Sequence, residues 1–175
     1  MKIIAFAGSN SSKSINKKLV TYASTLFKDA EVEILDLRDY QAPLFSVDVE
    51  REIGQAKEAL AFLAKLKSAD MLLISLAENN GNYSTAFKNI FDWCSRIEKD
   101  VFQKKPTLLM VTSPGGRGGK GVLEIAQSNL PRYGVEIKAV FSLPSFNDNF
   151  DSENNVISNP EFDNELKEIV SNFKL

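Results

Sequence analysis

The chain has 175 residues, of which 43% are hydrophobic, and its 21 basic and 23 acidic residues leave a net charge of −2. This length and composition suit one domain, residues 1–175, and charge scattered in this way is unexpected for a nucleic-acid-binding protein. The sequence has no His and a single Cys, Cys94, which excludes His-based hydrolytic triads, zinc sites and internal disulfides. A carboxylate-based hydrolase stays open, but we expect a cofactor to supply the chemistry and no metal.

The first predicted element is a buried strand over the apolar run Ile3–Ala7, which ends at Gly8. A helix follows, with Ser14 or Asn16 as its cap. Its apolar residues recur at three- and four-residue spacing: Ile15, Leu19, Val20, Ala23, Leu26 and Phe27. The opening apolar run is too short for a signal peptide or a membrane span, so we expect a cytoplasmic location.

The loop between this strand and helix is rich in Ser and Asn and contains Lys13. Free backbone N–H groups at a helix N-terminus suit a phosphate, although the same residue types are also ordinary in loops and caps. The position of the loop, at the carboxyl end of the first strand, favours the phosphate site.

Two known phosphate-binding patterns fit the chain poorly. The nucleoside-triphosphate loop needs a Gly directly before its Lys, but Ser12 precedes Lys13, and the spacing from Gly8 is one residue short. The stretch Gly116–Gly121 formally satisfies the dinucleotide pattern, yet no acidic residue stands about twenty positions on, near Phe141, to bind a ribose. We therefore expect neither a nucleoside triphosphatase nor a Rossmann-type NAD site.

The rest of the chain alternates between strands and helices. Strands are predicted at 31–37, 71–77, 107–112 and 135–143, helices at 49–67, 83–97, 122–130 and 160–173, and loops at 38–48, 78–82, 113–119 and 144–159. Such alternation predicts an α/β fold, with a five-stranded parallel sheet and helices on both faces.

A strand order of 2-1-3-4-5 would bring the loops after the first, third and fourth strands to one crevice, where open parallel sheets bind ligands. These are the Ser-rich loop, the polar loop 78–82 and the loop 113–119. Five of the nine glycines lie within 115–121. This density suits backbone that approaches a ligand closely, although a plain surface loop is the alternative.

Three motifs in the chain are similar to those of one known family. Gly8–Asn16 resembles Gly-Ser-x-Arg-x-x-Ser-x-Asn, with Ser11 in place of the Arg. Ala77–Asn80 stands where the family has Pro-Glu-Tyr-Asn, and Phe87–Trp93 contains an intact Lys-Asn-x-x-Asp-Trp. Ser113–Gly119 looks like the family's Gly-rich loop. The chain thus resembles, over most of its length, the NADPH-dependent FMN reductase family, which includes quinone, chromate and azo-dye reductases.

The resemblance implies a flavodoxin-like three-layer sandwich and an enzyme that passes electrons from NADPH or NADH through FMN to a small acceptor such as a flavin or quinone. Its motif matches imply that the FMN phosphate is held by Ser9, Ser11, Lys13, Ser14, Ile15 and Asn16. They imply that the flavin ring is flanked by Ala77, Glu78, Asn79, Asn80, Ser113, Pro114, Gly115, Gly116 and Gly118. No catalytic side chain is expected, because the flavin carries the chemistry.

Two other functions remain open. A flavodoxin-like carrier would bind FMN without oxidising a nicotinamide, and a flavin-free regulatory domain would fit the replacement of an Arg by Ser11 and of an aromatic residue by Asn79. The resemblance, together with the wide apolar stripe of Tyr83–Trp93, predicts a homodimer or homotetramer. The expected partners are small molecules, with no nucleic acid and no membrane.

Overall fold

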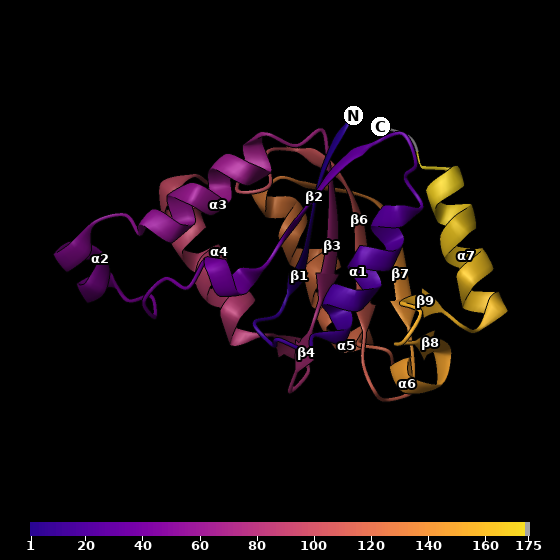
Figure 1. Cartoon of the computed structure of the whole chain (residues 1–175). Helices are drawn as coiled ribbons and strands as arrows, with labels where there is room; N and C mark the ends of the chain where they lie inside the picture. Colours follow the sequence, from indigo (N-terminus) through magenta and orange to yellow (C-terminus); the bar gives the residue numbers. More distant parts are fainter. Residues whose placement is uncertain (174–175) are drawn as a thin grey trace.

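The computed structural model describes residues 1–173 and contains a five-stranded parallel sheet between two layers of helices (Figure 1). The strands lie in the order β2-β1-β3-β6-β7. Their bounds are β1 Lys2–Gly8, β2 Glu31–Leu35, β3 Met71–Leu76, β6 Lys105–Thr112 and β7 Val135–Leu143. Counted along these five strands, the order is the predicted 2-1-3-4-5, so the predicted fold class is confirmed.

Helices cover both faces of the sheet. Helices α1 (Ile15–Thr25) and α7 (Pro160–Ser171) pack on one face, and α3 (Lys57–Lys67), α4 (Thr85–Ile97) and α5 (Lys120–Asn129) pack on the other (Figure 1). Successive side chains of a strand point to opposite faces of the sheet. Each strand therefore contributes apolar side chains to the core on either face, and its sequence is a continuous apolar run. Within residues 1–173, every helix is too short or too polar to cross a bilayer.

The prediction of one helix over 49–67 is wrong. The chain forms two helices there, α2 (Val47–Ile53) and α3, and Gly54 ends α2 with a φ of 74°. Glycine adopts a positive φ without the steric cost that a Cβ would bring, which suits it to this position. The apolar spacing continues across the break, which is why the sequence pattern did not reveal it. Helix α2 stands away from the body of the molecule (Figure 1), and none of its residues is buried.

Three predicted loops contain short elements of their own. The loop 38–48 starts within a short 3-10 helix. The loop 78–82 is part of a hairpin, and the loop 144–159 holds a short helix and a second hairpin. The short elements are η1 Leu37–Asp39, β4 Glu78–Asn79, β5 Asn82–Tyr83, η2 Leu130–Tyr133, α6 Phe146–Asn149, β8 Phe150–Asp151 and β9 Val156–Ile157. The strands in both hairpins are two residues long, below the length at which alternation can be recognised in a sequence.

The aromatic residues of α4 pack inside the chain. Phe87, Phe91 and Trp93 are at most 5% exposed, and their ring neighbours include Phe6 and Tyr133. The width of the apolar stripe therefore reflects the core of one chain, and the sequence argument that used it as evidence for a subunit interface is wrong.

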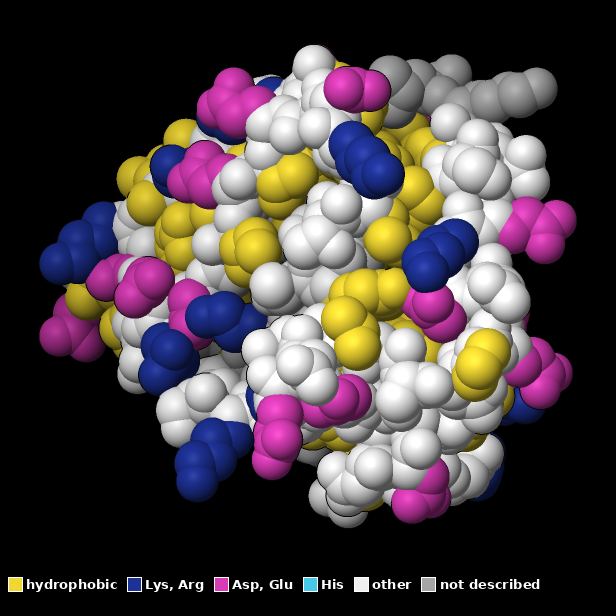
Figure 2. All heavy atoms as spheres, turned by 45° about the vertical axis from the view of Figure 1, so that its right-hand side comes forward, with side chains coloured by type: hydrophobic (Ala, Val, Ile, Leu, Met, Phe, Trp, Pro, Cys, Tyr) yellow, Lys and Arg dark blue, Asp and Glu magenta, His cyan; other side chains and the backbone are white. Residues whose placement is uncertain are grey.

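Charge on the surface is as mixed as it is along the sequence. Basic and acidic side chains are interspersed on the face that Figure 2 shows. Several form ion pairs, such as Lys167 with Asp163 on α7 at 2.6 Å. Exposed pairs of this kind contribute little to stability, with a median of about 0–1 kcal/mol.

Candidate functional site

The loops after β1, β3 and β6 meet at the carboxyl edge of the sheet, which is the lower edge in Figure 1. Direct contacts join them. The Ser84 hydroxyl, at the start of α4, donates to the carbonyl of Gly8 at 2.7 Å. The Glu78 carboxylate accepts from the backbone N–H of Val122, the third residue of α5, at 2.8 Å. The convergence predicted from the strand order is thus present.

Ser14 sets the start of α1. Its side-chain oxygen accepts from the N–H of Lys17 at 3.1 Å, so Ser14 rather than Asn16 is the cap. The first N–H groups of a helix have no intrahelical partner. No hydrogen bond between described residues uses the N–H of Ile15, which leaves this donor for a ligand.

The hydroxyls of Ser9 and Ser11 shape the loop before Ser14. The N–H of Ser11 donates to the Ser9 hydroxyl oxygen at 3.2 Å, and the N–H of Lys13 donates to the Ser11 oxygen at 3.3 Å. Because both oxygens accept from backbone, their O–H hydrogens remain available to donate outward. The N–H groups of Asn10 and Ser12 also donate no hydrogen bond to any described residue. Together these donors suit a bound phosphate.

Lys13 is the cation of this loop. It is exposed and takes part in none of the ion pairs between described residues. Lys17, by contrast, binds Asp36 at the end of β2. Hydrogen bonds from Arg38, followed by those from Lys17, hold the pKa of Asp36 well below its usual range. Lys17 is therefore committed to a carboxylate, while Lys13 can face an anion.

Asn16 is buried, with 2% of its surface exposed, and both polar atoms of its side-chain amide form hydrogen bonds inside the protein. The amide oxygen accepts from the Thr112 N–H at 3.0 Å and from the Ser75 hydroxyl at 2.8 Å, and the amide nitrogen donates to the Thr112 carbonyl at 3.1 Å. Strand β3 pairs with β6 only as far as Val111. At the next residue of β6, Thr112, the Asn16 amide makes the hydrogen bonds that a further residue of β3 would otherwise make. A contact from Asn16 to a phosphate would have to come from its backbone.

The hairpin after β3 presents the second set of predicted residues. Ala77 is partly buried, while Asn79 and Asn80 are exposed. Asn80 and Gly81 form the turn with φ of 50° and 74°, the geometry of a type I′ hairpin. The carboxylate of Glu78 points to α5, so Glu78 can flank a ring only through its backbone.

Two backbone hydrogen bonds join the glycine-rich loop to the start of α6. The carbonyls of Ser113 and Gly115 accept from the N–H groups of Phe146 and Ser145, each at 3.0 Å. Pro114, Gly115 and Gly116 are exposed. The N–H groups of Gly115 and Gly116 donate no hydrogen bond to any described residue. Two donors in the exposed part of this loop therefore remain for a ligand.

Gly118 serves a different purpose from the exposed part of its loop. It is buried, with a φ of 61°, and an added Cβ would lie 2.5 Å from the Ser142 hydroxyl oxygen and 3.1 Å from Pro144. A side chain has no room there. The structure thus places Gly118 against β7 and the segment that follows it, where it fixes the course of the loop.

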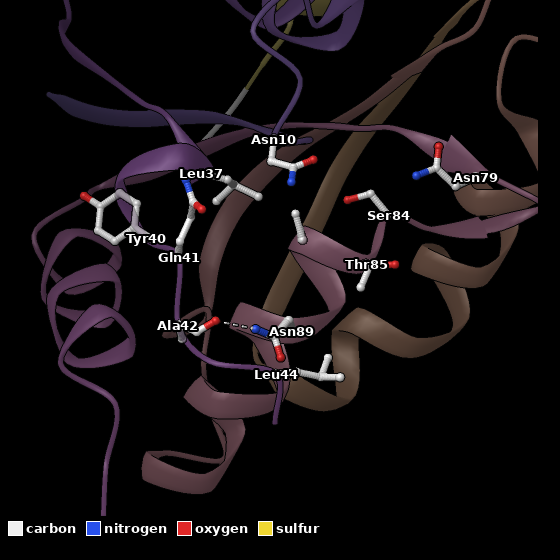
Figure 3. Close-up of a pocket in the computed structure, with 11 residues that line it drawn as sticks. Asn10, Leu37, Tyr40, Gln41, Ala42, Leu44, Asn79, Ser84, Thr85 and Asn89 are labelled. Atoms are coloured by element: carbon white, nitrogen blue, oxygen red, sulfur yellow. Dashed lines mark hydrogen bonds between the residues drawn. The ribbon is translucent and has the colours of Figure 1, made fainter. Parts of the chain in front are cut away.

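A cavity of about 390 Å³ lies beside these loops (Figure 3). Asn10 lines it from the loop before α1, and Asn79 lines it from the hairpin. The other walls come from the segment after β2, with Tyr40 and Gln41, and from the start of α4, with Thr85 and Asn89. None of the lining side chains carries a formal charge, so the cavity suits an uncharged ligand with hydrogen-bonding groups.

Sequence reasoning missed the segment after β2, although its signal was present in the Lys-Asn-x-x-Asp-Trp motif. Asn89 donates to the Ala42 carbonyl at 3.0 Å (Figure 3) and accepts from the Phe45 N–H at 2.8 Å. Trp93 donates to the Pro43 carbonyl at 2.7 Å. Two residues of the motif therefore hold one wall of the cavity.

A model of the family described as NADPH-dependent FMN reductase matches residues 1–149. A 2-hydroxy-1,4-benzoquinone reductase from Burkholderia is 33% identical over 132 residues, which cover 74% of this chain and 68% of that protein. A protein named NADH-dependent flavin reductase subunit 2, from Lactobacillus johnsonii, is 27% identical over 128 residues, which cover 71% of this chain and 66% of that protein.

Solved structures with the same fold include the flavoenzyme NAD(P)H:(acceptor) oxidoreductase from Paracoccus denitrificans. It superposes with a TM-score of 0.75 and 20% sequence identity, covering 97% of this chain and 93% of that one. At this level of identity the likeness supports the fold alone.

Proposed function

Because the chain belongs to the NADPH-dependent FMN reductase family, we propose that it binds one FMN at the carboxyl edge of the sheet and passes electrons from NADPH or NADH to a small acceptor. The observation that carries this proposal is the cluster of unused donors where the loops after β1, β3 and β6 meet. The fold provides this crevice at the point where the strand order reverses.

The phosphate of FMN suits the loop before α1. Backbone N–H groups of Asn10, Ser12 and Ile15 can donate to it, together with the hydroxyls of Ser9 and Ser11. The positive end of the α1 dipole favours a negative charge at the same place. Ser14 and Asn16 support the site indirectly, since one starts the helix and the other ties it to β3 and β6.

The flavin ring suits the space between the hairpin at 78–83 and the loop at 113–118. Bound FMN supplies the redox chemistry, because it accepts electrons from the nicotinamide and passes them to the acceptor. The chain orients the ring, and the N–H groups of Gly115 and Gly116 can donate to its negatively charged edge. The uncharged cavity beside Asn10 and Asn79 gives a small acceptor room next to the ring.

The test of this proposal is a flavin spectrum of the purified protein before and after FMN is added, followed by anaerobic mixing with NADPH or NADH. We expect the bound flavin to bleach within the mixing experiment. A yellow protein that does not bleach would instead be a flavodoxin-like electron carrier. Absence of binding at FMN concentrations up to about 1 mM would exclude both functions.

Gly116→Val should slow the reduction of bound FMN by nicotinamide at least about tenfold while leaving the fold intact. An added Cβ at this position meets nothing closer than the Ser145 hydroxyl at 3.9 Å, so the protein accommodates it, whereas a ring beside the loop does not. Stopped-flow reduction and a thermal melt measure the two effects. The control is Gln127→Val at an exposed site on α5. Reduction at the wild-type rate in Gly116→Val would place the ring elsewhere.

The protruding helix α2 supports an assembly of more than one chain, and we propose a homodimer. Three apolar side chains in this helix or just before it are exposed, at 73% for Leu44, 49% for Val47 and 48% for Ile53. Arg96 of α4 holds α2 in place by donating to the Glu50 carboxylate at 2.9 Å. Apolar side chains held away from the body of their own chain are typical of subunit contacts.

Light scattering at micromolar concentration should therefore give the mass of at least two chains. The double variant Val47→Asp/Ile53→Asp should raise the dimer dissociation constant at least about tenfold, since each apolar side chain buried contributes about 1.5–3 kcal/mol. Val156→Asp, at an exposed site on β9, is the matched control. A monomeric mass for the unmodified chain with FMN present would refute the dimer.

A further inference from the structure

Glu78 provides the N-terminal cap of a helix that begins 42 positions later in the sequence. Its carboxylate accepts from the N–H of Val122 at 2.8 Å. Helix α5 has no cap of its own, because its N-cap residue is Gly119, which has no side chain and a φ of 79°. A helix without a local cap leaves its first N–H groups unsatisfied, and a carboxylate at this end also interacts favourably with the helix dipole.

Gly121 makes room for this contact. A Cβ added at residue 121 would lie 2.8 Å from the Glu78 carboxylate oxygen, closer than van der Waals contact allows. Glycine inside a helix destabilises it by about 0.5–1 kcal/mol relative to alanine. The absence of a side chain at the second position of α5 leaves this space to the carboxylate.

The contact joins the two segments proposed to enclose the flavin ring. Glu78 begins the hairpin that exposes Asn79 and Asn80, and α5 follows directly on the glycine-rich loop. The hairpin strands are two residues long, and a hairpin of that length is not stable by itself. Its position relative to the glycine-rich loop thus depends on contacts such as this one.

We propose that Glu78 is a positioning residue: through the N-terminus of α5 it fixes the spacing between the hairpin and the glycine-rich loop, and so the width of the ring site. The inference rests on the proposed function for the identity of the ligand. The link between hairpin and helix can be tested without any ligand.

The first measurement is amide hydrogen exchange in the FMN-free protein. Glu78→Ala should accelerate exchange at Val122 and across residues 79–83 at least about tenfold. Glu78→Gln, which keeps an acceptor oxygen, should restore most of the protection. Gly121→Ala should resemble Glu78→Ala because the new methyl group displaces the carboxylate, and it serves as a second variant if Glu78→Ala fails to fold. Glu124→Ala, at an exposed site on α5, is the control.

The second measurement is titration of FMN and riboflavin into each apo variant. Glu78→Ala should weaken both flavins about tenfold and equally, because the ring site changes and the phosphate site does not, and Glu78→Gln should stay within about threefold of the unmodified chain. The double variant Glu78→Ala/Gly121→Ala should be no weaker than either single variant, as expected for two changes that remove one contact.

The outcomes separate the two proposals. If the unmodified chain binds no flavin, the proposed function fails, and the exchange data still decide whether Glu78 links the hairpin to α5. If exchange accelerates but both flavins bind Glu78→Ala as before, the contact is only a helix cap and the inference is overturned. Additive losses in the double variant would overturn it as well.

Discussion

Replacing Asn16 with alanine should lower the free energy of unfolding by about 2–4 kcal/mol. The side chain makes three hydrogen bonds, and its removal leaves the N–H and carbonyl of Thr112 and the hydroxyl of Ser75 without partners. Ser75 and Thr112 are at most 1% exposed, and each buried polar group without a partner costs about 1–3 kcal/mol. Urea unfolding of the FMN-free protein measures the loss.

Asn10→Ala is the matched control for this experiment. Asn10 lies in the same loop, is exposed, and makes no side-chain hydrogen bond with the described residues, so its removal should change stability by less than about 0.5 kcal/mol. If Asn16 instead held the phosphate through its side chain, Asn16→Ala would lose FMN affinity and keep its stability. That result would contradict the network seen in the structure.

The sheet could be predicted from sequence because its signals are local. Strands buried on both faces are apolar without interruption, as in Ile3–Ala7 and Met71–Leu76, and alternation with helices then implies parallel pairing. The Ser-rich and Gly-rich loops could be found for the same reason: both lie directly after such strands.

The direction of each side chain at the site could not be predicted, because it depends on groups far away in the sequence. Asn16 turns inward to Thr112, 96 residues on, and Glu78 turns to Val122, 44 residues on. Both residues occupy motif positions that the resemblance assigns to flavin binding. In this fold their side chains hold the loops proposed to bind FMN in place, and in that proposal only their backbone remains for the flavin.

Lys13→Ala should weaken FMN about 10- to 100-fold and leave riboflavin nearly unchanged. Ser11 stands where the family has an arginine, and Lys17 is paired with Asp36, so Lys13 is the cation that can compensate a phosphate in this loop. A hydrogen bond to a charged group contributes about 1.5–3 kcal/mol, and each 1.4 kcal/mol is a factor of ten in affinity. Riboflavin lacks the phosphate and should not respond. Fluorescence-quenching titrations of both flavins into the apo protein measure the difference.

Lys28→Ala provides the control, because it removes the same charge from an exposed site beyond the other end of α1. Both variants must be titrated at one ionic strength, since salt screens exposed charges. The difference between them then isolates the local contact from the change in net charge. Equal losses for FMN and riboflavin in Lys13→Ala would mean that this lysine shapes the loop and does not bind the phosphate. Unchanged FMN affinity would mean that backbone N–H groups and the hydroxyls of Ser9 and Ser11 hold the phosphate without a cation.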